Sequence, residues 1–472
     1  MNPFANIHAT AISGVVLIIA TSAQGFGAVY CVDAASGSDG NPGTSAAPWR
    51  SLTKVNAVQA SLQPGDSVLL RRGTTFAGPL LTSASGSAGL PITYGAYGDG
   101  AKPVITGLVS VTSWTSVGGG VFEATVPSAP AATRVVVLDG AVTAKGRYPN
   151  RGTGNGGYLV IDSSSGPNSL TDDALASMSN WTGAEVVIRK NRWIVDRYVI
   201  SSHAGSTLTF TNDNGYNPES GYGYFIQNDT RVLDQAGEWC FNGSTKQLRM
   251  YNGASAPGRV DIAAVENVVV LSGRHDIILD NVAISGGHGA GIVADNVAAI
   301  TVRNCEMRLN YQALSGTSIN GLTIEDTTID STTNNGVALT DASNCIVRRV
   351  NVSRTGLFAG NGGNGDGTYT GINFYRGSGN LIDNFVITDT GYTPITFQGS
   401  DFTISNGFID RYALTKDDGG AIYCWDGGNI GYFNRRIFNN IVLDGIGSPG
   451  GTRQSFSWCA YGIYLDDGTN NV

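Results

Sequence analysis

The sequence predicts an all-β fold, a parallel β-helix in which short strands stack coil upon coil. Two ladders of apolar residues predict it, because both recur mostly at intervals of 22 to 23 residues through the second half of the chain. The composition agrees, since 65 of the 472 residues are glycine and only 14% are charged, as expected for many turns and few surface helices. A repeat of this length implies a solenoid of stacked coils.

The first ladder is an apolar residue followed two places later by Asn, Asp or, once, Arg. Its apolar members are Leu279, Val302, Ile324, Val347, Ile382, Ile404 and Phe438. Three places after each polar residue comes a further apolar one: Ile284, Met307, Ile329, Val352, Ile387, Ile409 and Leu443. Stacked Asn side chains can hydrogen-bond along a solenoid, so we expect this column at an inward turn, with a local bulge where Arg349 interrupts it.

The second ladder predicts strands that turn one face inward. Its members are Ile292, Leu314, Val337, Ile372, Ile395, Ile422 and Ile463. Around them apolar residues alternate with others, as in Ile395-Thr396-Phe397-Gln398, and this period of two is that of a strand. Leucine-rich repeats share the coil length, but their Leu-x-x-Leu-x-Leu pattern is absent.

Charge and the first residues indicate the compartment and the class of partner. A net charge of −8 without a basic stripe argues against nucleic acid and fits a neutral polysaccharide better than a polyanionic one. The apolar run over residues 11–23 is too short to span a bilayer, so residues 1–23 are expected to be a signal peptide. We expect a secreted monomer, extracellular or periplasmic, with no membrane contact after cleavage. A lipid-facing anchor is the alternative, because the first ten residues contain no Lys or Arg.

Six cysteines are scattered along the chain, and none forms a metal-type Cys-x-x-Cys pair. Cys305, Cys345 and Cys424 fall on or beside ladder positions, which predicts buried apolar packing. The sequence does not decide whether Cys424 and Cys459 form a disulfide. His288 lies in a Gly-rich turn and is interpreted as structural.

The N-terminal segment predicts a cap over the first coil. Tyr30-Cys31-Val32-Asp33 and Pro48-Trp49-Arg50-Ser51-Leu52 precede a short amphipathic helix expected over Lys54–Leu62. An open solenoid end exposes core and strand edges, so a capping element is needed. This opening resembles the N-terminal cap of secreted right-handed parallel β-helix proteins of the pectin-lyase-like superfamily.

The coil period disappears between residues 108 and 258, which predicts an insertion. Its motifs Gly146-Arg147-Tyr148-Pro149-Asn150, Gly223-Tyr224-Phe225 and Gly237-Glu238-Trp239 resemble the inserted domain of β-helical glycoside hydrolases. The resemblance implies a right-handed parallel β-helix divided into a cap with first coils (28–107), an inserted β-rich domain (108–258) and the main β-helix (259–472). Because residue 472 falls part-way through a coil, we expect a piece of a longer protein or a truncated product.

Irregular ladder intervals predict a groove. Three intervals are stretched, and the additional residues enter just before the strand that carries the second ladder. Long loops beside one face of a rigid scaffold are the expected walls of a binding groove. Aromatic, amide and charged side chains of this face and its loops suit sugar binding: Asp366, Asn373, Tyr375, Arg376, Gln398, Lys416, Tyr423, Trp425 and Tyr464. The alternative is a solvent-facing strand with stabilising aromatic stacks.

Five carboxylates near this face are candidates for acid–base catalysis: Asp417, Asp418, Asp426, Asp466 and Asp467. Coils are about 4.8 Å apart, so carboxylates one coil apart approach the roughly 5–5.5 Å of a retaining glycosidase, and two coils apart an inverting spacing of about 9.6 Å. Turn chemistry alone explains Asp426 and Asp467. Asp418 and Asp466 lie at opposite ends of their strands, so they act together only if the Gly419-Gly420 pair folds Asp418 over the groove.

The motif Asp417-Asp418-Gly419-Gly420 faintly resembles the Asp pair of polygalacturonase-type hydrolases, and Asn364-Gly365-Asp366-Gly367 resembles their Asn-Thr-Asp-Gly. Two departures stand against that activity. Asp366 and Asp418 are two ladder steps apart, and Gly287-His288-Gly289 lies upstream instead of downstream.

The leading prediction is a secreted glycoside hydrolase that cleaves a polysaccharide or oligosaccharide with paired Asp carboxylates and needs no cofactor. The first alternative is a polysaccharide lyase that uses Lys416 or Arg376, with Ca²⁺ held by Asp residues. The second is a non-catalytic glycan-binding or surface β-helix protein, because fold alone does not define function.

Overall fold

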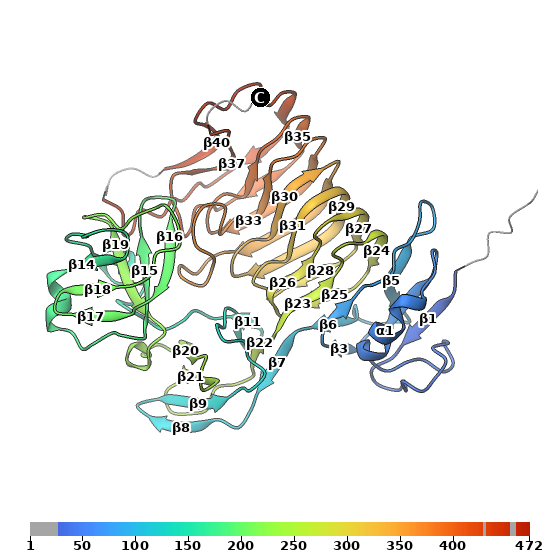
Figure 1. The fold of residues 1–472 in the computed structure, drawn as a ribbon, viewed down its shortest axis with the longest axis horizontal. Helices are drawn as coiled ribbons and strands as arrows, with labels where there is room; N and C mark the ends of the chain where they lie inside the picture. Colours follow the sequence, from blue (N-terminus) through green and yellow to red (C-terminus); the bar gives the residue numbers. More distant parts are fainter. Residues whose placement is uncertain (1–26, 428–430, 454–458) are drawn as a thin grey trace, which may run out of the picture.

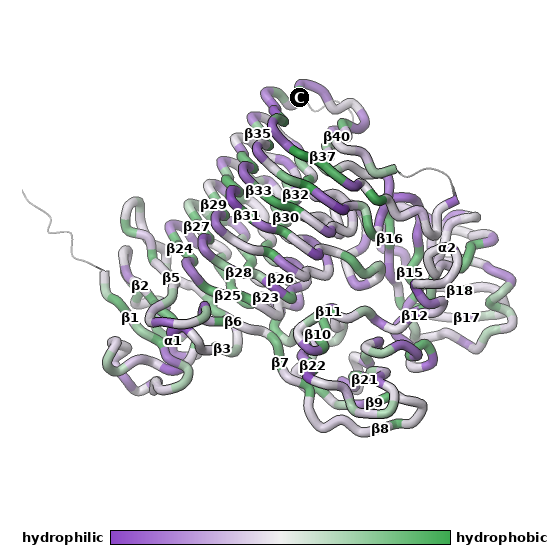
Figure 2. Tube along the Cα trace, turned by 180° about the vertical axis from the view of Figure 1, so that it is seen from behind, coloured by the Kyte–Doolittle hydropathy of each residue, from purple (hydrophilic) through white to green (hydrophobic). Residues whose placement is uncertain are grey.

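A computed structural model describes residues 27–427, 431–453 and 459–472, so the predicted signal peptide lies outside the described residues. Within them the chain forms a parallel β-helix of stacked coils, with further β-rich lobes along one side (Figure 1). Three stacks of short strands form the walls of the coil, and hydrophobic stretches recur along these strands (Figure 2). The all-β, parallel β-helical fold predicted from the ladders is therefore confirmed.

The first stack carries the second ladder, and all seven expected rungs pair in register from Ile292 to Ile463. Its strands are β4 (Leu80–Leu81), β23 (Val265–Val270), β26 (Gly287–Val293), the start of β29 (Leu314–Thr332), β30 (Val337–Ser343), β32 (Ile372–Tyr375), β34 (Ile395–Phe397), β37 (Gly419–Trp425) and β40 (Ala460–Asp466).

The other two stacks carry the first ladder. The second stack holds β1 (Val29–Val32), β2 (Ser67–Arg71), β5 (Ile92–Tyr97), β24 (His275–Asp280), β27 (Val297–Arg303), β35 (Phe402–Ser405) and β38 (Arg435–Phe438). The third holds β3 (Thr75–Ala77), β6 (Val104–Thr106), β25 (Ala283–Ser285), β28 (Glu306–Arg308), β36 (Phe408–Asp410) and β39 (Ile441–Val442). The long strands β29, β31 (Ile346–Thr355) and β33 (Leu381–Thr390) turn the corner and belong to both stacks.

The last rung of the first ladder lies one residue earlier in the structure than the sequence pattern predicts. Ile404 pairs with Ile437 and Ile409 with Val442. The predicted rungs Phe438 and Leu443 are instead 46% and 47% exposed. A shift of one residue moves a side chain to the other face of a strand. The ladder pattern therefore continues into this coil, but its predicted register is wrong by one residue.

The polar column of the first ladder faces outward, which corrects the expected inward stack. Asn304 donates to Asp280 at 2.8 Å in an exposed contact, and Asn406 donates to Asp383 at 2.7 Å. The first six column positions have positive φ, including Arg349 at 49°, and so does Asn439, the seventh position in the corrected register. Asn and Asp recur because they tolerate the left-handed conformation of this corner. The expected bulge is absent, because β31 runs through Arg349 and the guanidinium binds Asp326.

A short helix covers the first coil, close to the predicted position. It is α1 (Leu52–Val58), and the Ser51 hydroxyl caps it by accepting from Lys54 N at 3.2 Å. Leu52 and Val55 are buried against the coil. No disulfide joins any of the six cysteines, all of which lie in the described parts of the chain, so Cys424 and Cys459 are not bridged; Cys305, Cys345 and Cys424 are buried as predicted.

Between β6 and β23 the chain leaves the solenoid and forms four antiparallel sheets, which we call the insert. It starts at β7 (Leu108–Val111) and returns at β22 (Val260–Ala263), and these strands pair with each other. Nearest to them lie β8 (Thr115–Gly118), β9 (Val121–Thr125), β10 (Val136–Leu138), β11 (Ala141–Val142), β20 (Trp239–Asn242) and β21 (Gln247–Tyr251). A second lobe holds α2 (Gly154–Gly157), β12 (Arg147–Tyr148), β13 (Leu159–Val160), β14 (Ser169–Thr171), β15 (Glu185–Arg189), β16 (Val195–Val199), β17 (Ser202–Ala204), β18 (Thr207–Thr209) and β19 (Gly223–Gln227).

Candidate active site

The long loops before β32, β37 and β40 meet the second lobe of the insert, which lies beside the upper coils in Figure 1. Backbone hydrogen bonds join them: Asp417 N donates to Arg192 O at 3.0 Å, and Gly223 N donates to Gly451 O at 2.8 Å. The stretched repeats therefore dock against the insert, on the side of the solenoid where the sequence predicts a groove.

Asp418 lies half-buried at the entrance to β37. Its backbone adopts a positive φ of 61°, and Tyr392 donates its hydroxyl to Asp418 O at 2.8 Å. Burial raises the pKa of the Asp418 carboxyl; Arg192 opposes this effect, and the carboxylates of Asp466 and Asp417 add to it. A carboxyl with a raised pKa is suited to donate a proton.

Asp466 ends β40, and its environment differs from that of Asp418. Tyr423 donates its hydroxyl to Asp466 Oδ2 at 2.8 Å. The rings of Tyr423 and Tyr464 meet edge to face with centroids 5.5 Å apart. The pKa of Tyr464 is raised by burial and then by Asp418 and Asp466, so the ring lies within electrostatic range of both carboxylates. The two aspartates lie at opposite strand ends, as expected, yet their charges are coupled.

Asp366 lies exposed in the long loop before β32. Tyr216 of the insert donates its hydroxyl to Asp366 Oδ2 at 2.8 Å. Beneath the loop, the fully buried Lys416 ammonium donates to Gly365 O at 3.0 Å and to Thr368 Oγ1 at 2.6 Å. Burial lowers the pKa of Lys416 to about 7, although Asp196 and Asp366 act in the opposite direction. The loop that presents Asp366 is thus fixed from both sides.

The phenol of Tyr392 is buried near these carboxylates. The pKa of Tyr392 is raised well above its ordinary value, first by burial and then by Asp418, Asp366 and Asp466. A charge contributes to a neighbouring titration only at short range, so each of the three carboxylates lies within electrostatic range of the Tyr392 hydroxyl. We call Asp366, Asp418 and Asp466 the carboxylate cluster.

Two of the predicted catalytic carboxylates are structural. Asp417 is fully buried, forms an ion pair with Arg192 and accepts from Cys459 N at 2.9 Å. Asp426 is also buried and accepts from both guanidinium nitrogens of Arg435, at 3.0 and 2.8 Å. A buried paired carboxylate cannot reach a substrate in the groove, so both assignments are corrected.

Three of the predicted substrate-binding residues are also occupied elsewhere. Lys416 and Gln398 are buried, and Gln398 donates to Trp425 O. Arg376 directly follows β32, at the end opposite to the loop of Asp366, and its guanidinium forms an ion pair with Asp341 at 2.8 Å. Lys416 holds the loop of Asp366, and the polar groups of Gln398 and Arg376 already have protein partners.

The remaining predicted residues lie along the outer face of the first stack. Asn373 is half-buried and donates to Gly367 O at 3.3 Å, below the loop of Asp366. Tyr375 and Trp425 are 44% and 42% exposed. Asp467 is exposed at the turn after β40 and accepts from the Trp425 indole at 3.3 Å. Tyr375, Trp425 and Asp467 are therefore open to solvent at the C-terminal ends of their strands.

Sequence reasoning missed four residues of the site. Arg192, Trp193 and Tyr216 belong to the insert, and Trp193 donates its indole N–H to the Tyr216 hydroxyl at 3.3 Å. Tyr392 precedes β34 by three residues. The only available signal was aromatic enrichment of the insert, which does not say where the insert docks.

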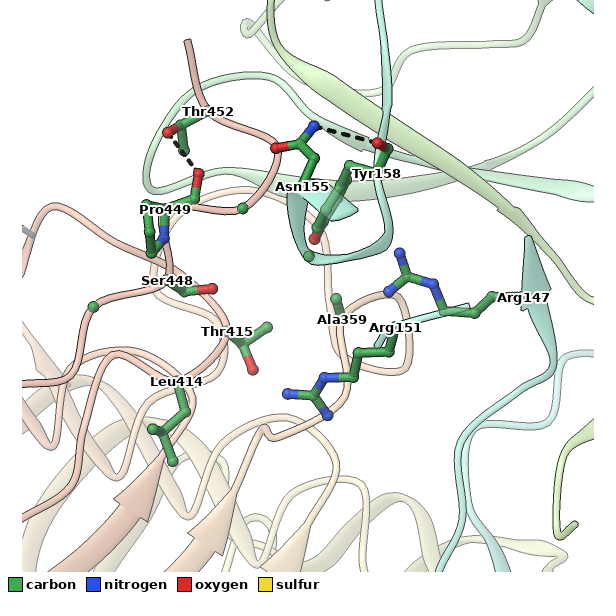
Figure 3. A pocket seen from close by; sticks show the side chains of 13 residues that line it. Arg147, Arg151, Asn155, Tyr158, Ala359, Leu414, Thr415, Ser448, Pro449 and Thr452 are labelled. Atoms are coloured by element: carbon green, nitrogen blue, oxygen red, sulfur yellow. Dashed lines mark hydrogen bonds between the residues drawn. The ribbon is translucent and has the colours of Figure 1, made fainter. Parts of the chain in front are cut away.

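The carboxylate cluster lies outside a separate cavity of about 480 Å³ between the insert and the loops before β37 and β40 (Figure 3). That cavity is lined by Arg147, Arg151 and Tyr158 but by no carboxylate.

His288 is buried at 6% exposure, and burial lowers its pKa to about 4, in keeping with a structural role. In the described parts of the chain, no three His, Cys, Asp or Glu side chains are grouped as a metal would require. No helix of these parts is long and apolar enough to cross a membrane.

Comparison with known proteins places the fold. Residues 267–366 match the family model for right-handed β-helix regions. A stretch of 84 residues is 51% identical to a lacto-N-biosidase of Bifidobacterium longum subsp. longum; it covers 17% of this chain and only 5% of that protein. A solved structure described as a glycoside hydrolase superposes with a TM-score of 0.71 over 91% of this chain and 90% of that one, at 15% identity. A GH136 lacto-N-biosidase from Eubacterium ramulus gives a TM-score of 0.44 at 14% identity, over 93% of this chain and 67% of that one. The chain is a right-handed parallel β-helix similar to glycoside hydrolases.

Proposed function

We propose that the protein is a glycoside hydrolase that cleaves a glycosidic bond beside Asp418 and Asp466. The observation that carries this proposal is the carboxylate cluster, in which three acidic side chains act on the buried phenol of Tyr392. The short stretch shared with a lacto-N-biosidase supports the reaction class. The substrate is an oligosaccharide or a polysaccharide, and a secreted location fits such a substrate.

The two aspartates have different environments, as paired carboxylates in such enzymes require. Asp418, with its raised pKa, donates a proton to the glycosidic oxygen, and the bond from that oxygen to the anomeric carbon breaks. Asp466 accepts a hydrogen bond from the Tyr423 hydroxyl, which orients its carboxylate. It acts as the nucleophile or as the base that activates water.

Aromatic side chains supply the sugar contacts. Tyr461 and Tyr464 of β40 lie with ring centroids 4.7 Å apart, and Tyr461 is 44% exposed. On the opposite wall Trp193 meets Tyr216 edge to face at 6.2 Å. Flat apolar rings stack on sugar faces, and the exposed carboxylate of Asp366 can accept from sugar hydroxyls.

The lyase alternative has less support, because both cations assigned to it have other contacts. Lys416 is fully buried under the loop of Asp366, and Arg376 pairs with Asp341. A lyase would need a basic group within reach of the carbon that loses the proton.

An activity screen tests the proposal. The panel contains plant and microbial polysaccharides and a chromogenic lacto-N-bioside, with reducing ends and the absorbance of unsaturated uronates as readouts. We expect new reducing ends without unsaturation, and a loss of about 10²–10⁴-fold in kcat/KM for Asp418→Asn and Asp466→Asn. Asp467→Asn is the matched control, because Asp467 is an exposed carboxylate next to Asp466. Unsaturated products would favour the lyase, and glycan binding without cleavage would favour a non-catalytic protein.

A further inference from the structure

A cavity apart from the carboxylate cluster carries uncompensated positive charge. It has a volume of about 480 Å³ and lies between the insert and the loops that precede β37 and β40. Figure 3 shows the guanidinium groups of Arg147 and Arg151 directed into it from one side, with Ser448 on the other. We call it the arginine cavity.

Neither arginine has a carboxylate partner among the described residues. Arg147 is 9% exposed, donates to Pro149 O at 3.0 Å and to Gly157 O, and stacks on Phe225 with its guanidinium carbon 3.3 Å from the ring centroid. Arg151 is exposed, and its one ring contact is Phe358 at 6.0 Å. Among the described residues neither guanidinium forms an ion pair, so two positive charges share the lining of one cavity without a paired carboxylate.

The electrostatics agree with the geometry. The pKa of Arg147 is lowered to about 10, mainly by burial and also by the neighbouring charge of Arg151, while Tyr158 and Glu238 act in the opposite direction. Glu238 accepts backbone hydrogen bonds from Asp234 and Gln235 and does not line the cavity. A partly buried cation is costly unless an anion accompanies it. An anionic ligand between the two guanidinium groups would remove this repulsion.

The cavity is formed before any ligand enters. Gly451 N donates to Asn155 Oδ1 at 3.0 Å, and Gly223 N donates to Gly451 O at 2.8 Å, so the loop is fastened to the insert above the cavity. Behind it the buried Arg189 donates to Thr415 O at 3.0 Å and to Gly450 O at 3.3 Å. A preformed wall lowers the ordering cost of binding.

We propose that the arginine cavity binds a saccharide through a carboxylate or sulfate substituent. Guanidinium groups recognise planar and tetrahedral oxyanions through paired N–H donors. A cavity of about 480 Å³ is larger than a simple ion needs and suits a ligand the size of a sugar unit. The Tyr158 ring in the lining is itself buried, with the Arg147 guanidinium over it at 5.2 Å, so it shapes the wall of the cavity. The whole chain carries a net charge of −8, which repels a polyanion. The local positive charge of the arginine cavity therefore favours a saccharide with a single charged unit.

Binding measurements on the full chain test the proposal without requiring catalysis. The probes are galacturonic acid, galactose 6-sulfate, neutral galactose and sodium sulfate, titrated by calorimetry at low and high ionic strength. We expect both charged sugars to bind, galactose not to bind, and the affinity to fall as salt is added. Arg151→Gln should weaken binding roughly 10–100-fold, as the loss of charge-assisted hydrogen bonds predicts. Arg50→Gln removes the same charge from an exposed arginine of the N-terminal cap and should leave the affinity unchanged.

Arg151 is chosen because it is exposed, whereas Arg147 stacks within the insert and its loss could unfold that lobe. Equal affinity for galactose and galacturonic acid would overturn the proposal, and so would unchanged binding in Arg151→Gln. Sodium sulfate bound as tightly as both charged sugars would show an ion site and overturn the saccharide assignment. The proposal does not rest on hydrolysis, so an inactive enzyme that still binds charged sugars would leave it standing.

Discussion

At the scale of single residues, the environment of Asp418 sets the expected pH dependence. A proton donor must be protonated, and burial, with the charges of Asp466 and Asp417, raises the pKa of Asp418 above the ordinary value for aspartic acid. The rate should therefore persist to higher pH than an exposed aspartic acid would allow, and then fall as pH rises through the raised pKa. The measurement is kcat/KM against pH for the wild type. Asp467→Asn should give the same profile, and a rate that rises with pH through this range would contradict the assignment.

Lys416 makes a second residue-scale prediction, this time for stability. Its folded-state pKa of about 7 lies below the ordinary lysine value of about 10.4, so between these values the unfolded chain binds a proton that the folded chain does not. The contribution of Lys416 to the free energy of unfolding should therefore increase as pH rises from about 7 towards 10.

Lys416→Met removes this titration, and the difference between the two proteins isolates it from other groups. Urea unfolding at several pH values from about 7 to 9.5 should show that the wild type gains stability relative to the variant as pH rises. The variant should also lose activity, because Lys416 holds Gly365 and Thr368 and thereby the loop of Asp366. A pH-independent difference in stability would contradict the lowered pKa.

At the scale of strands and turns, the ladders predicted most of the scaffold but not its corners. The apolar rungs from Ile292 to Ile422 are buried and follow a period that burial imposes, so their register could be predicted; Ile463 keeps this register although it is 52% exposed. The last rung slipped because Ile437 and Phe438 are adjacent apolar residues before two asparagines. The outward polar column depends on backbone φ, which apolar periodicity does not encode. Arg349 adopts the same φ of 49° as its Asn and Asp neighbours, which no residue preference would have indicated.

The turn after each first-stack strand gives a prediction at this scale. Asp426 and Asp467 occupy the same turn column in neighbouring coils, but Asp426 is buried against Arg435 whereas Asp467 is exposed. Asp426→Asn leaves a buried guanidinium without its carboxylate, which should destabilise the fold by about 3–5 kcal/mol. Asp467→Asn should change stability by less than about 0.5 kcal/mol. Thermal and denaturant unfolding of both variants provide the test, and equal effects would mean that the Asp426 pair is solvated.

At the scale of the whole molecule, the candidate site is built from two parts, each of which has its own hydrophobic core. The main apolar core contains residues of the cap and coils, and the insert has its own clusters around Ile188 and Trp239. The contact between Tyr216 and Asp366 joins residues 150 positions apart. No local pattern encodes such a contact, so the half of the groove that the solenoid supplies could be predicted and the half that the insert supplies could not.

This division predicts the outcome of removing the insert. Leu108 and Ala263 are opposite each other in the antiparallel pair of β7 and β22, so a short Gly-Ser linker can replace residues 109–262 without stretching the coil. We expect the trimmed chain to keep the far-UV circular dichroism of a β-helix and to melt at a lower temperature, because surfaces such as that of Tyr311 lose their cover.

Hydrolysis by the trimmed chain should fall at least as far as in Asp418→Asn, because Arg192, Trp193 and Tyr216 are removed and the loop of Asp366 loses its partner. The matched comparison is Asp418→Asn in the full chain, which removes chemistry but leaves the groove intact and should still bind the oligosaccharide. The trimmed chain should bind it weakly. If the trimmed chain retains its β-helical spectrum and hydrolyses substrate within about tenfold of the wild type, the insert is not a wall of the active site.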